Sequence, residues 1–229
     1  LQLVESQRLA SIGQFASGIV HEIRNPLATI SLALEHLGRL SDLPENSRTR
    51  VALATDEITR LERLLADILL YAKPLVLDRS DTDLPALISD VVRSHLDDRS
   101  RIGLVMQPCP SLSIDRDRIT QVLLNLLRNA LEAAPPDGQV TVHCQPKDGA
   151  WVSVSVNNGG TPIGERERER LFQPFFTTKP QGTGLGLPIA RRLVEAHGGK
   201  IGLSSDQATG TTVTVSLPVQ RPGTKNAAG

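Results

Sequence analysis

The chain has 229 residues, enough for one large or two modest domains, and 39% of them are apolar, enough for packed cores. Lys plus Arg and Asp plus Glu balance at 25 each, which excludes a general attraction to nucleic acid or to membrane surfaces. Cys109 and Cys144 lack the spacing of a metal site, so we expect free or buried thiols. Apolar runs fall short of the roughly 20 residues of a membrane span, and no signal peptide is visible. We expect a cytoplasmic piece of a longer protein, whose only link to a membrane would be segments upstream of this sequence.

Residues 3–40 form the first predicted helix. Apolar or small residues recur along it at alternating spacings of four and three, the pattern of a coiled coil or four-helix bundle: Ile12, Ala16, Ile19, Ile23, Pro26, Ile30, Ala33 and Leu37. His21 lies two residues from Ile19 and Ile23, so the helical period turns it away from this stripe, toward water or a partner. Pro26 has no N–H for the carbonyl of Glu22, which predicts a bend beside His21.

A turn-rich break at residues 41–47 precedes a second predicted helix. The same repeat continues along this helix in Val51, Ala54, Ile58, Leu61, Leu65, Ile68 and Ala72. Pro74 ends it, because the residue before a proline avoids the helical region. Two such helices make an antiparallel hairpin with a half-open apolar stripe, and pairing with a second copy into a four-helix bundle is the economical way to cover it. We therefore predict a homodimer and a domain boundary at residue 74.

From residue 75 the pattern changes to short strands and helices. We predict strands at 76–83, 103–107, 139–145, 151–156, 200–205 and 211–217, and helices at 84–96, 116–134 and 187–197. Asp115 is the expected N-cap of the middle helix, and Gly198-Gly199 should stop the last one. Residues 157–186 are predicted to be rich in loops. The mixture favours an α/β sandwich whose helices cover one face of the sheet.

The helix at 116–134 carries a polar stripe opposite its apolar one. This stripe consists of Arg118, Gln121, Asn125, Asn129 and Glu132. A solvated face is the ordinary explanation of such a stripe. Asn is a poor helix former, however, so two of them one turn apart in mid-helix indicate a further use. Their amide oxygens are hard ligands suited to Mg²⁺, which keeps substrate phosphates in its shell.

Two glycine-rich segments follow, and each alone would more often be structural. Residues 157–163, Asn-Asn-Gly-Gly-Thr-Pro-Ile, lead from a strand into a tight turn where a ligand can approach the backbone. Residues 182–186, Gly-Thr-Gly-Leu-Gly, open a helix whose free N–H groups and dipole favour phosphate. This segment is neither a dinucleotide fingerprint nor a Walker loop. Between the two, residues 172–179 hold three of the four Phe residues of the chain.

A family resemblance connects these stretches. Residues 21–27, His-Glu-Ile-Arg-Asn-Pro-Leu, resemble the H-box of sensor histidine kinases, in which the His accepts a phosphoryl group. The stretches of the second half resemble, in the family's order, the N, G1, F and G2 boxes of its ATP-binding domain. The resemblance implies an α+β chain with a dimeric phosphoacceptor hairpin over residues 1–74, a Bergerat-type α/β sandwich over 75–220 and a tail over 221–229.

The resemblance also implies that ATP and Mg²⁺ bind in the second domain. Asn129, with Asn125 nearby, would hold Mg²⁺ against the phosphates, and Phe175 and Phe176 would anchor the loop that covers them. The other residues implied to contact the nucleotide are Asn157, Gly159, Thr161, Lys179, Gly182, Thr183, Gly184, Leu185 and Gly186.

Three positions depart from the family pattern. Asn157 replaces the Asp that accepts a hydrogen bond from the adenine amine, and Thr161 replaces the second Gly of the same box. Asn can accept as well, but without charge and with donors beside the acceptor, which weakens the bond and the discrimination against guanine. Glu132 stands where many relatives have Lys.

The predicted reaction is phosphoryl transfer from MgATP to His21, with Glu22 accepting from one ring nitrogen. Transfer to an Asp of a response-regulator receiver domain would follow. Asn25 occupies the place from which the family positions water to dephosphorylate that partner. Two alternatives stay open: a non-catalytic dimeric signalling scaffold with a weakened nucleotide site, and an ATPase of the gyrase and heat-shock type without a phosphohistidine.

Overall fold

The computed structural model describes residues 23–40, 43–72, 75–96, 98–179 and 182–219. The chain divides into two compact units, Leu1–Pro74 and Leu75–Gly229. Within the described ranges, no helix combines the length and the apolar character that crossing a bilayer requires.

The first unit is a helical hairpin made by a helix over residues 23–38 and α2 (Glu45–Ala72). The carbonyl of Pro44 accepts from the N–H groups of Ser47 (2.8 Å) and Arg48 (3.0 Å), so α2 begins at Glu45, inside the predicted break. The predicted bend beside His21 depends on residues outside the described ranges.

The packing of the hairpin corrects the predicted apolar stripe. Its buried core consists of Leu27, Ile58, Leu65 and Leu69, with Leu34 packed against them. The predicted stripe residues Ile23 (41%), Ile30 (48%) and Leu37 (41%) are exposed in the single chain. Leu27 and Leu34, seven residues apart, lie on another line of the same helix and pack into the cluster with α2. The stripe members Ile12, Ala16 and Ile19 lie outside the described residues.

The second unit contains a mixed five-stranded sheet in the order β2-β4-β5-β7-β6. Its strands are β2 (Ile102–Met106), β4 (Val140–Lys147), β5 (Trp151–Asn158), β6 (Lys200–Asp206) and β7 (Gly210–Pro218). β2 is parallel to β4, and the other neighbours are antiparallel. The register places Asn157 between Thr141 on β4 and Thr212 on β7, so the candidate adenine residue lies inside the sheet rather than at its edge.

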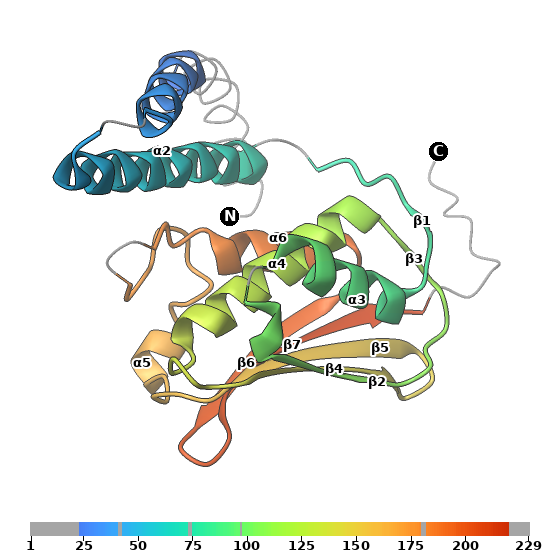
Figure 1. Cartoon of the computed structure of the whole chain (residues 1–229). Helices are drawn as coiled ribbons and strands as arrows, with labels where there is room; N and C mark the ends of the chain where they lie inside the picture. The colour runs from blue at the N-terminus through green and yellow to red at the C-terminus, as the bar shows by residue number, and fades with distance from the viewer. Residues whose placement is uncertain (1–22, 41–42, 73–74, 97, 180–181, 220–229) are drawn as a thin grey trace. The chain divides into compact units, whose positions relative to one another are not determined.

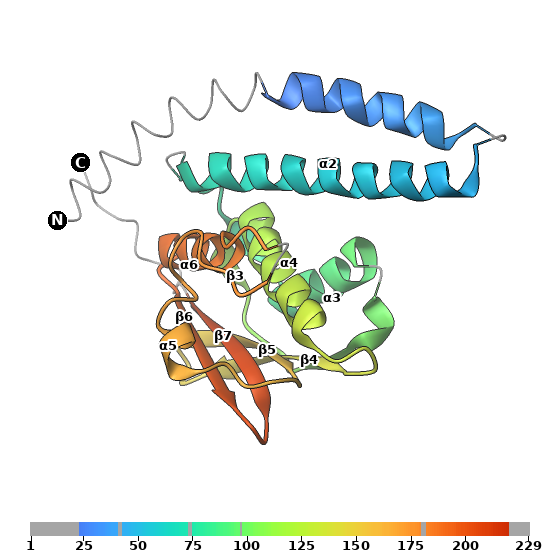
Figure 2. The same cartoon turned by 90° about the vertical axis from the view of Figure 1, so that its left-hand side faces the viewer.

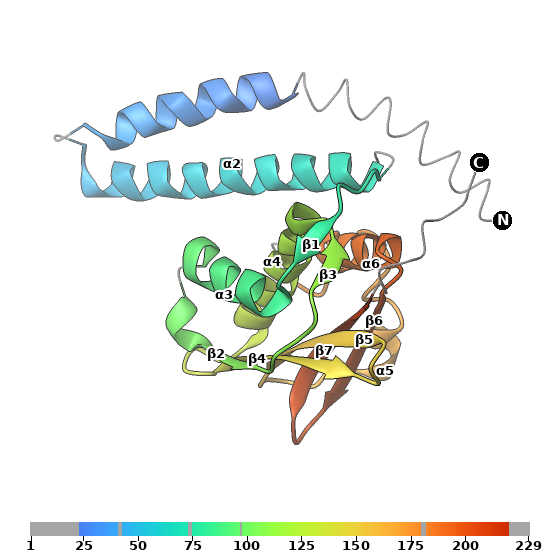
Figure 3. The same cartoon turned by 90° about the vertical axis from the view of Figure 1, so that its right-hand side faces the viewer.

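Three helices cover one face of this sheet: α3 (Leu84–His95), α4 (Arg116–Ala133) and α6 (Gly186–Ala196). All three lie on the same side in each view (Figures 1, 2 and 3). Leu126 and Leu127 of α4 and Leu193 of α6 are at most 2% exposed. The predicted helical region followed by an α/β sandwich is therefore confirmed.

Smaller elements differ from the prediction. β1 (Ser80–Thr82) is only part of the strand expected at 76–83, and it pairs with β3 (Leu112–Ile114), which was not predicted. The predicted loop region contains the short helix α5 (Glu165–Arg168), and a 3₁₀ turn, η1 (Arg99–Arg101), precedes β2. These elements have three or four residues each, too few for a periodic signal.

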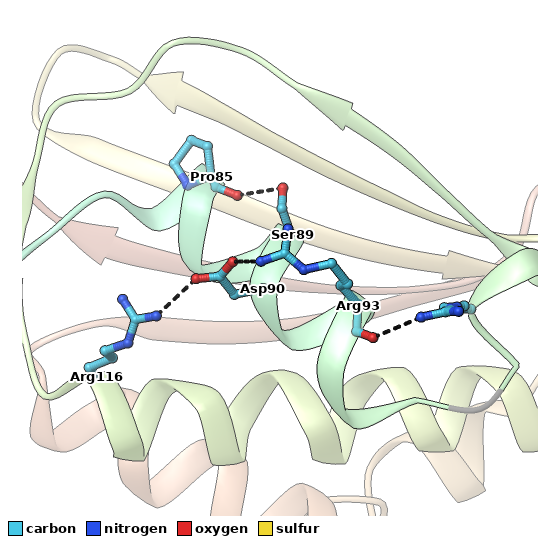
Figure 4. Close-up of polar contacts among 6 residues, drawn as sticks. Pro85, Ser89, Asp90, Arg93 and Arg116 are labelled. Carbon is cyan, nitrogen blue, oxygen red and sulfur yellow. Dashed lines mark hydrogen bonds and ion pairs between the residues drawn. The ribbon is translucent and has the colours of Figure 1, made fainter.

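Asp90 joins α3 to the beginning of α4 (Figure 4). Its carboxylate accepts from Arg93 on its own helix (2.7 Å) and from Arg116 on α4 (3.1 Å). These side chains are 42–72% exposed, so the bridges contribute roughly 0–1 kcal/mol each. The buried side chains of Ile88 and Val91 hold α3 in place far more strongly.

A buried polar cluster fixes the start of α4 against the end of α6. The Asp115 carboxylate accepts from the N–H groups of Arg118 and Asp78 (3.0 Å each), which confirms it as the N-cap of α4. His197, 1% exposed, accepts at Nε2 from the Asp115 N–H (3.0 Å). Its Nδ1 donates to the Leu193 carbonyl (2.7 Å), so one tautomer is fixed.

The charges of this cluster follow from its burial and hydrogen bonds. Burial is the main cause that lowers the pKa of His197, and the hydrogen bond to Leu193 opposes it. For Asp115, burial favours the neutral acid, but the N–H groups of Arg118 and Asp78 outweigh it and lower the pKa of the carboxyl. The cluster is therefore a neutral imidazole beside a carboxylate at neutral pH.

The two thiols are free, as expected. Cys144 is buried on β4, with its Sγ 3.8 Å from the Cys109 Sγ. Burial, helped by Cys109, raises the pKa of Cys144 to about 12, so this thiol stays protonated at neutral pH.

Candidate functional site

Asn125 of α4 holds the beginning of α6. Its Nδ2 donates to the Gly186 carbonyl (3.0 Å), and its Oδ1 accepts from Gln121 Nε2 (3.4 Å). The opposite orientation of the amide would place two oxygens in contact, so this orientation is favoured. Both ends of the Asn125 amide therefore have partners within the protein, and its Nδ2 holds the beginning of α6.

Asn129 lies one turn further along α4, on the same face. Among the described residues, its side-chain amide has no hydrogen-bond partner, which leaves its oxygen available to a ligand. A Cβ added to Gly186 would lie 3.6 Å from Asn129 Nδ2 and 3.9 Å from Asn125 Cγ, so both amides face the start of α6. Over the described part of the chain, no three His, Cys, Asp or Glu side chains form a metal site. An ion at Asn129 would therefore need further oxygens from a substrate.

Asn157 directs its amide nitrogen into the protein. Nδ2 donates to the carbonyls of Thr209 (2.8 Å) and Thr211 (3.3 Å) and to Thr212 Oγ1 (2.8 Å). The flipped amide would place its oxygen against two carbonyl oxygens, so the orientation is fixed by its surroundings. Both donors of the Asn157 amide are therefore used within the protein, and the three hydrogen bonds leave its Oδ1 unused.

The turn after β5 is tightly held although its tip is open. Gly160 has φ of +134°, and a Cβ there would lie 2.8 Å from the Ala133 carbonyl, so this position requires glycine. Gly159 and Thr161 are exposed, and a Cβ on Gly159 would meet no atom within 4 Å, which leaves room for a ligand. Ser205 Oγ accepts from the Ile163 N–H (2.9 Å) and ties the end of the turn to β6.

Residues 175–179 and 182–185, hereafter the lid, lead into α6. Gly184 has φ of +67°, and its carbonyl accepts from the Phe175 N–H (3.0 Å). A Cβ on Gly184 would lie 2.8 Å from Phe175 Cα. The backbone at residue 184 can therefore approach Phe175 this closely only because residue 184 is glycine. Leu185 is fully buried, and Thr183 Oγ1 accepts from its N–H (3.3 Å). These contacts fix both ends of the lid.

One expectation about the lid is wrong. The Phe175 side chain is 65% exposed, so it does not anchor the lid against the described residues, and the contact with Gly184 is made by the backbone of Phe175, at φ +64°. The Phe176 ring lies under the Arg170 guanidinium, 4.2 Å from ring centroid to Cζ. Phe176 thus remains the aromatic contact at this end of the lid.

Lys179 carries the charge of the lid. Its Nζ lies 2.6 Å from Glu132 Oε2 and 3.5 Å from the Asn129 carbonyl oxygen, so the lid reaches the last turns of α4. The Gly182 N–H donates to the Lys179 carbonyl (3.1 Å), which ties this residue to the glycine segment.

The structure thus brings the predicted residues of α4, Lys179 and the Gly182–Gly186 segment to one end of the second unit. The contact of Asn157 with Thr212 and the close approach of Gly160 to the Ala133 carbonyl could not be predicted from local sequence, because each joins segments that only the fold brings together. His21 and Glu22 lie outside the described residues. Asn25 is exposed on the helix over 23–38, where its carbonyl accepts from Thr29 Oγ1 (3.2 Å).

Two family models match the chain. Residues 114–221 match the family described as histidine kinase-, DNA gyrase B-, and HSP90-like ATPase. Residues 11–74 match the His Kinase A (phospho-acceptor) domain.

Relatives with known names agree with these matches. The sensor histidine kinase ZraS of Escherichia coli (strain K12) is 33% identical over 223 residues, which are 95% of this chain and 48% of ZraS. The chain thus spans about half the length of this curated relative.

Solved structures of ShkA and of the histidine kinase ThkA share the fold. Full-length ShkA in complex with AMPPNP superposes with a TM-score of 0.75 at 26% identity, over 91% of this chain and 46% of ShkA. ThkA in complex with the response regulator protein TrrA gives 0.68 at 33% identity, over 93% of this chain and 64% of that one. The catalytic domain of ThkA alone is 36% identical, with a TM-score of 0.55, and this chain covers 95% of it. By both family models and by these relatives, the chain belongs to the sensor histidine kinases.

Proposed function

We propose that this chain is the phosphotransfer core of a two-component sensor kinase. Residues 1–74 would dimerise and carry the phosphoryl group on His21, and residues 75–220 would bind ATP. The observation that carries the proposal is the meeting of the free Asn129 amide, Lys179 and the start of α6 at one end of the sandwich. An amide oxygen, an ammonium group and a helix N-terminus are the groups that a metal-bound triphosphate requires.

The proposed pose of ATP follows from this arrangement. The Oδ1 of Asn157, whose amide nitrogen is engaged within the protein, would accept from the adenine amine, and the open turn at Gly159 and Thr161 would border the base. The phosphates would lie between Asn129 and the lid, where Lys179 and the N–H groups of Gly184 and Gly186 can reach them. Asn129 would hold Mg²⁺, which when bound neutralises the phosphate charge that grows during transfer. Asn125 would keep α6 in place beside them.

The proposed chemistry needs a neutral imidazole. The lone pair of one His21 nitrogen forms a bond to the γ-phosphorus as the bond from that phosphorus to the bridging oxygen breaks, and ADP leaves with the electron pair. Glu22, adjacent in sequence, would accept the hydrogen bond of the other ring nitrogen and stabilise the positive charge on the ring. The phosphoryl group would then pass to an Asp of a receiver domain.

The helical hairpin is the proposed docking surface for two partners, a second copy of the chain and a response regulator. The exposed stripe through Ile23, Ile30 and Leu37 gives the hairpin an apolar face suited to a second copy. Asn25, exposed four residues after His21, is proposed to position water for dephosphorylation of the regulator.

Two experiments separate this proposal from its rivals. A fluorescent ATP analogue should bind the native chain in the presence of Mg²⁺, and a chain that binds no nucleotide would be a scaffold. With γ-labelled ATP, His21→Ala should lose all label on the protein. An ATPase would be indicated instead if the native chain never became labelled and His21→Ala hydrolysed ATP at the native rate.

A further inference from the structure

The ion pair between Glu132 and Lys179 lies at the phosphate end of the proposed site. Both groups are partly exposed, Lys179 by 36% and Glu132 by 55%. Glu132 follows Asn129 by three residues on α4, so the two side chains lie on the same face of the helix. The carboxylate is therefore next to the proposed position of the ion and the phosphates, and it already holds the lid ammonium.

This arrangement has an electrostatic consequence for the ligand. A triphosphate that contacts Lys179 must compete with Glu132 for the ammonium, and it must approach the carboxylate as well. Together Glu132 and Lys179 carry no net charge, whereas Lys at position 132 would give two cations at the same place. Because the pair does not neutralise the negative charge of the triphosphate, a divalent cation bound to the phosphates has to do so.

We infer that Glu132 is a specificity-determining residue that makes this site select the metal-complexed triphosphate over the free one. The inference rests on the proposed function and concerns the same site. Free ATP meets the carboxylate with its full negative charge, whereas in MgATP the metal offsets that repulsion and offers the carboxylate a favourable neighbour.

The inference is tested by titrating AMPPNP into the protein by calorimetry, once with Mg²⁺ and once with EDTA. Glu132→Gln should bind the metal-free nucleotide about fivefold more tightly than the native chain, a size set by the solvent screening of a half-exposed charge. Its affinity for the magnesium complex should be unchanged or weaker. Glu132→Lys should bind the metal-free nucleotide more tightly still, with no matching gain for the magnesium complex.

The matched control is Glu195→Gln on α6. Glu195 forms a similar ion pair with Arg191 (2.7 Å, both about half exposed), away from the lid. Removing the Glu195 charge should leave the affinities for AMPPNP with Mg²⁺ and with EDTA unchanged. Thermal unfolding of each variant shows that the fold is kept. A native chain that binds AMPPNP under neither condition overturns the proposed function together with the inference. A chain that binds, but whose ratio of affinities with and without Mg²⁺ is the same in Glu132→Gln, overturns the inference alone.

Discussion

Replacing Gly184 by alanine tests whether the geometry of the lid determines nucleotide affinity. At φ of +67° an alanine costs about 1 kcal/mol. The added Cβ would also lie 2.8 Å from Phe175 Cα, so the backbone must move apart and lose the hydrogen bond from the Phe175 N–H to the Gly184 carbonyl, worth about 1 kcal/mol. If the nucleotide binds only the native lid, this sum of about 2 kcal/mol weakens binding roughly thirtyfold.

Gly149→Ala provides the matched control, because Gly149 has φ of +66° and no atom within 4 Å of an added Cβ. It lies at the bend between β4 and β5, so it should lower the free energy of unfolding by about 1 kcal/mol and leave AMPPNP binding unchanged. Both variants are measured by urea unfolding and by calorimetric titration. If Gly184→Ala bound AMPPNP as tightly as Gly149→Ala, the proposed role of the lid would be refuted.

Three further outcomes are expected. Leu127→Ala, at a fully buried position of α4, should lower the free energy of unfolding in urea by about 3 kcal/mol, and a loss under 1 kcal/mol would contradict the described core. Burial lowers the pKa of His197 below its ordinary 6.5, so the unfolded chain binds a proton more readily than the folded one, and the free energy of unfolding should fall as the pH drops below about 6.5. His197→Gln should make this pH dependence shallower. An equal slope in the native chain and the variant would exclude His197 as its source. ATP should displace a fluorescent analogue at least about tenfold better than GTP, since Asn157 presents an acceptor, and equal competition would argue against the described amide orientation.

The larger elements could be predicted because their signals are local. The apolar stripes of α4 and α6, the N-cap at Asp115 and the glycines after α6 specify helices whose ends the structure places within about two residues of the prediction. The alternating residues of β4 and β5 do the same for strands. The short strand β3 was missed because three residues carry no period, and its pairing with β1 is a long-range contact.

The site was predicted in its composition but not in its contacts. Sequence reasoning singled out Asn125 and Asn129 together, whereas only the fold shows that the Asn125 amide is used to hold Gly186. It left open whether the amide donors of Asn157 would spoil adenine selectivity, and the register with β7 shows where those donors go. Such roles depend on which strand or helix lies opposite, and that information is absent from local sequence.

The hairpin shows a different limit. The three-four repeat correctly indicated amphipathic helices, but two apolar lines run along the helix over 23–38. Among the described residues, Leu27 and Leu34 belong to the buried cluster with α2, while Ile23 and Ile30 stay exposed in the single chain. Hydrophobic spacing alone cannot decide which line faces the partner helix and which a second copy.

The most direct test of the central claim is to locate the phosphoryl group after incubation of the native chain with γ-labelled ATP and Mg²⁺. We expect a label that is stable in alkali and lost in acid, on the peptide that contains His21, and that is absent when Asn129 is replaced by alanine. A label on a hydroxyl side chain, which would survive acid, or no label on a chain that demonstrably binds ATP, would contradict the account.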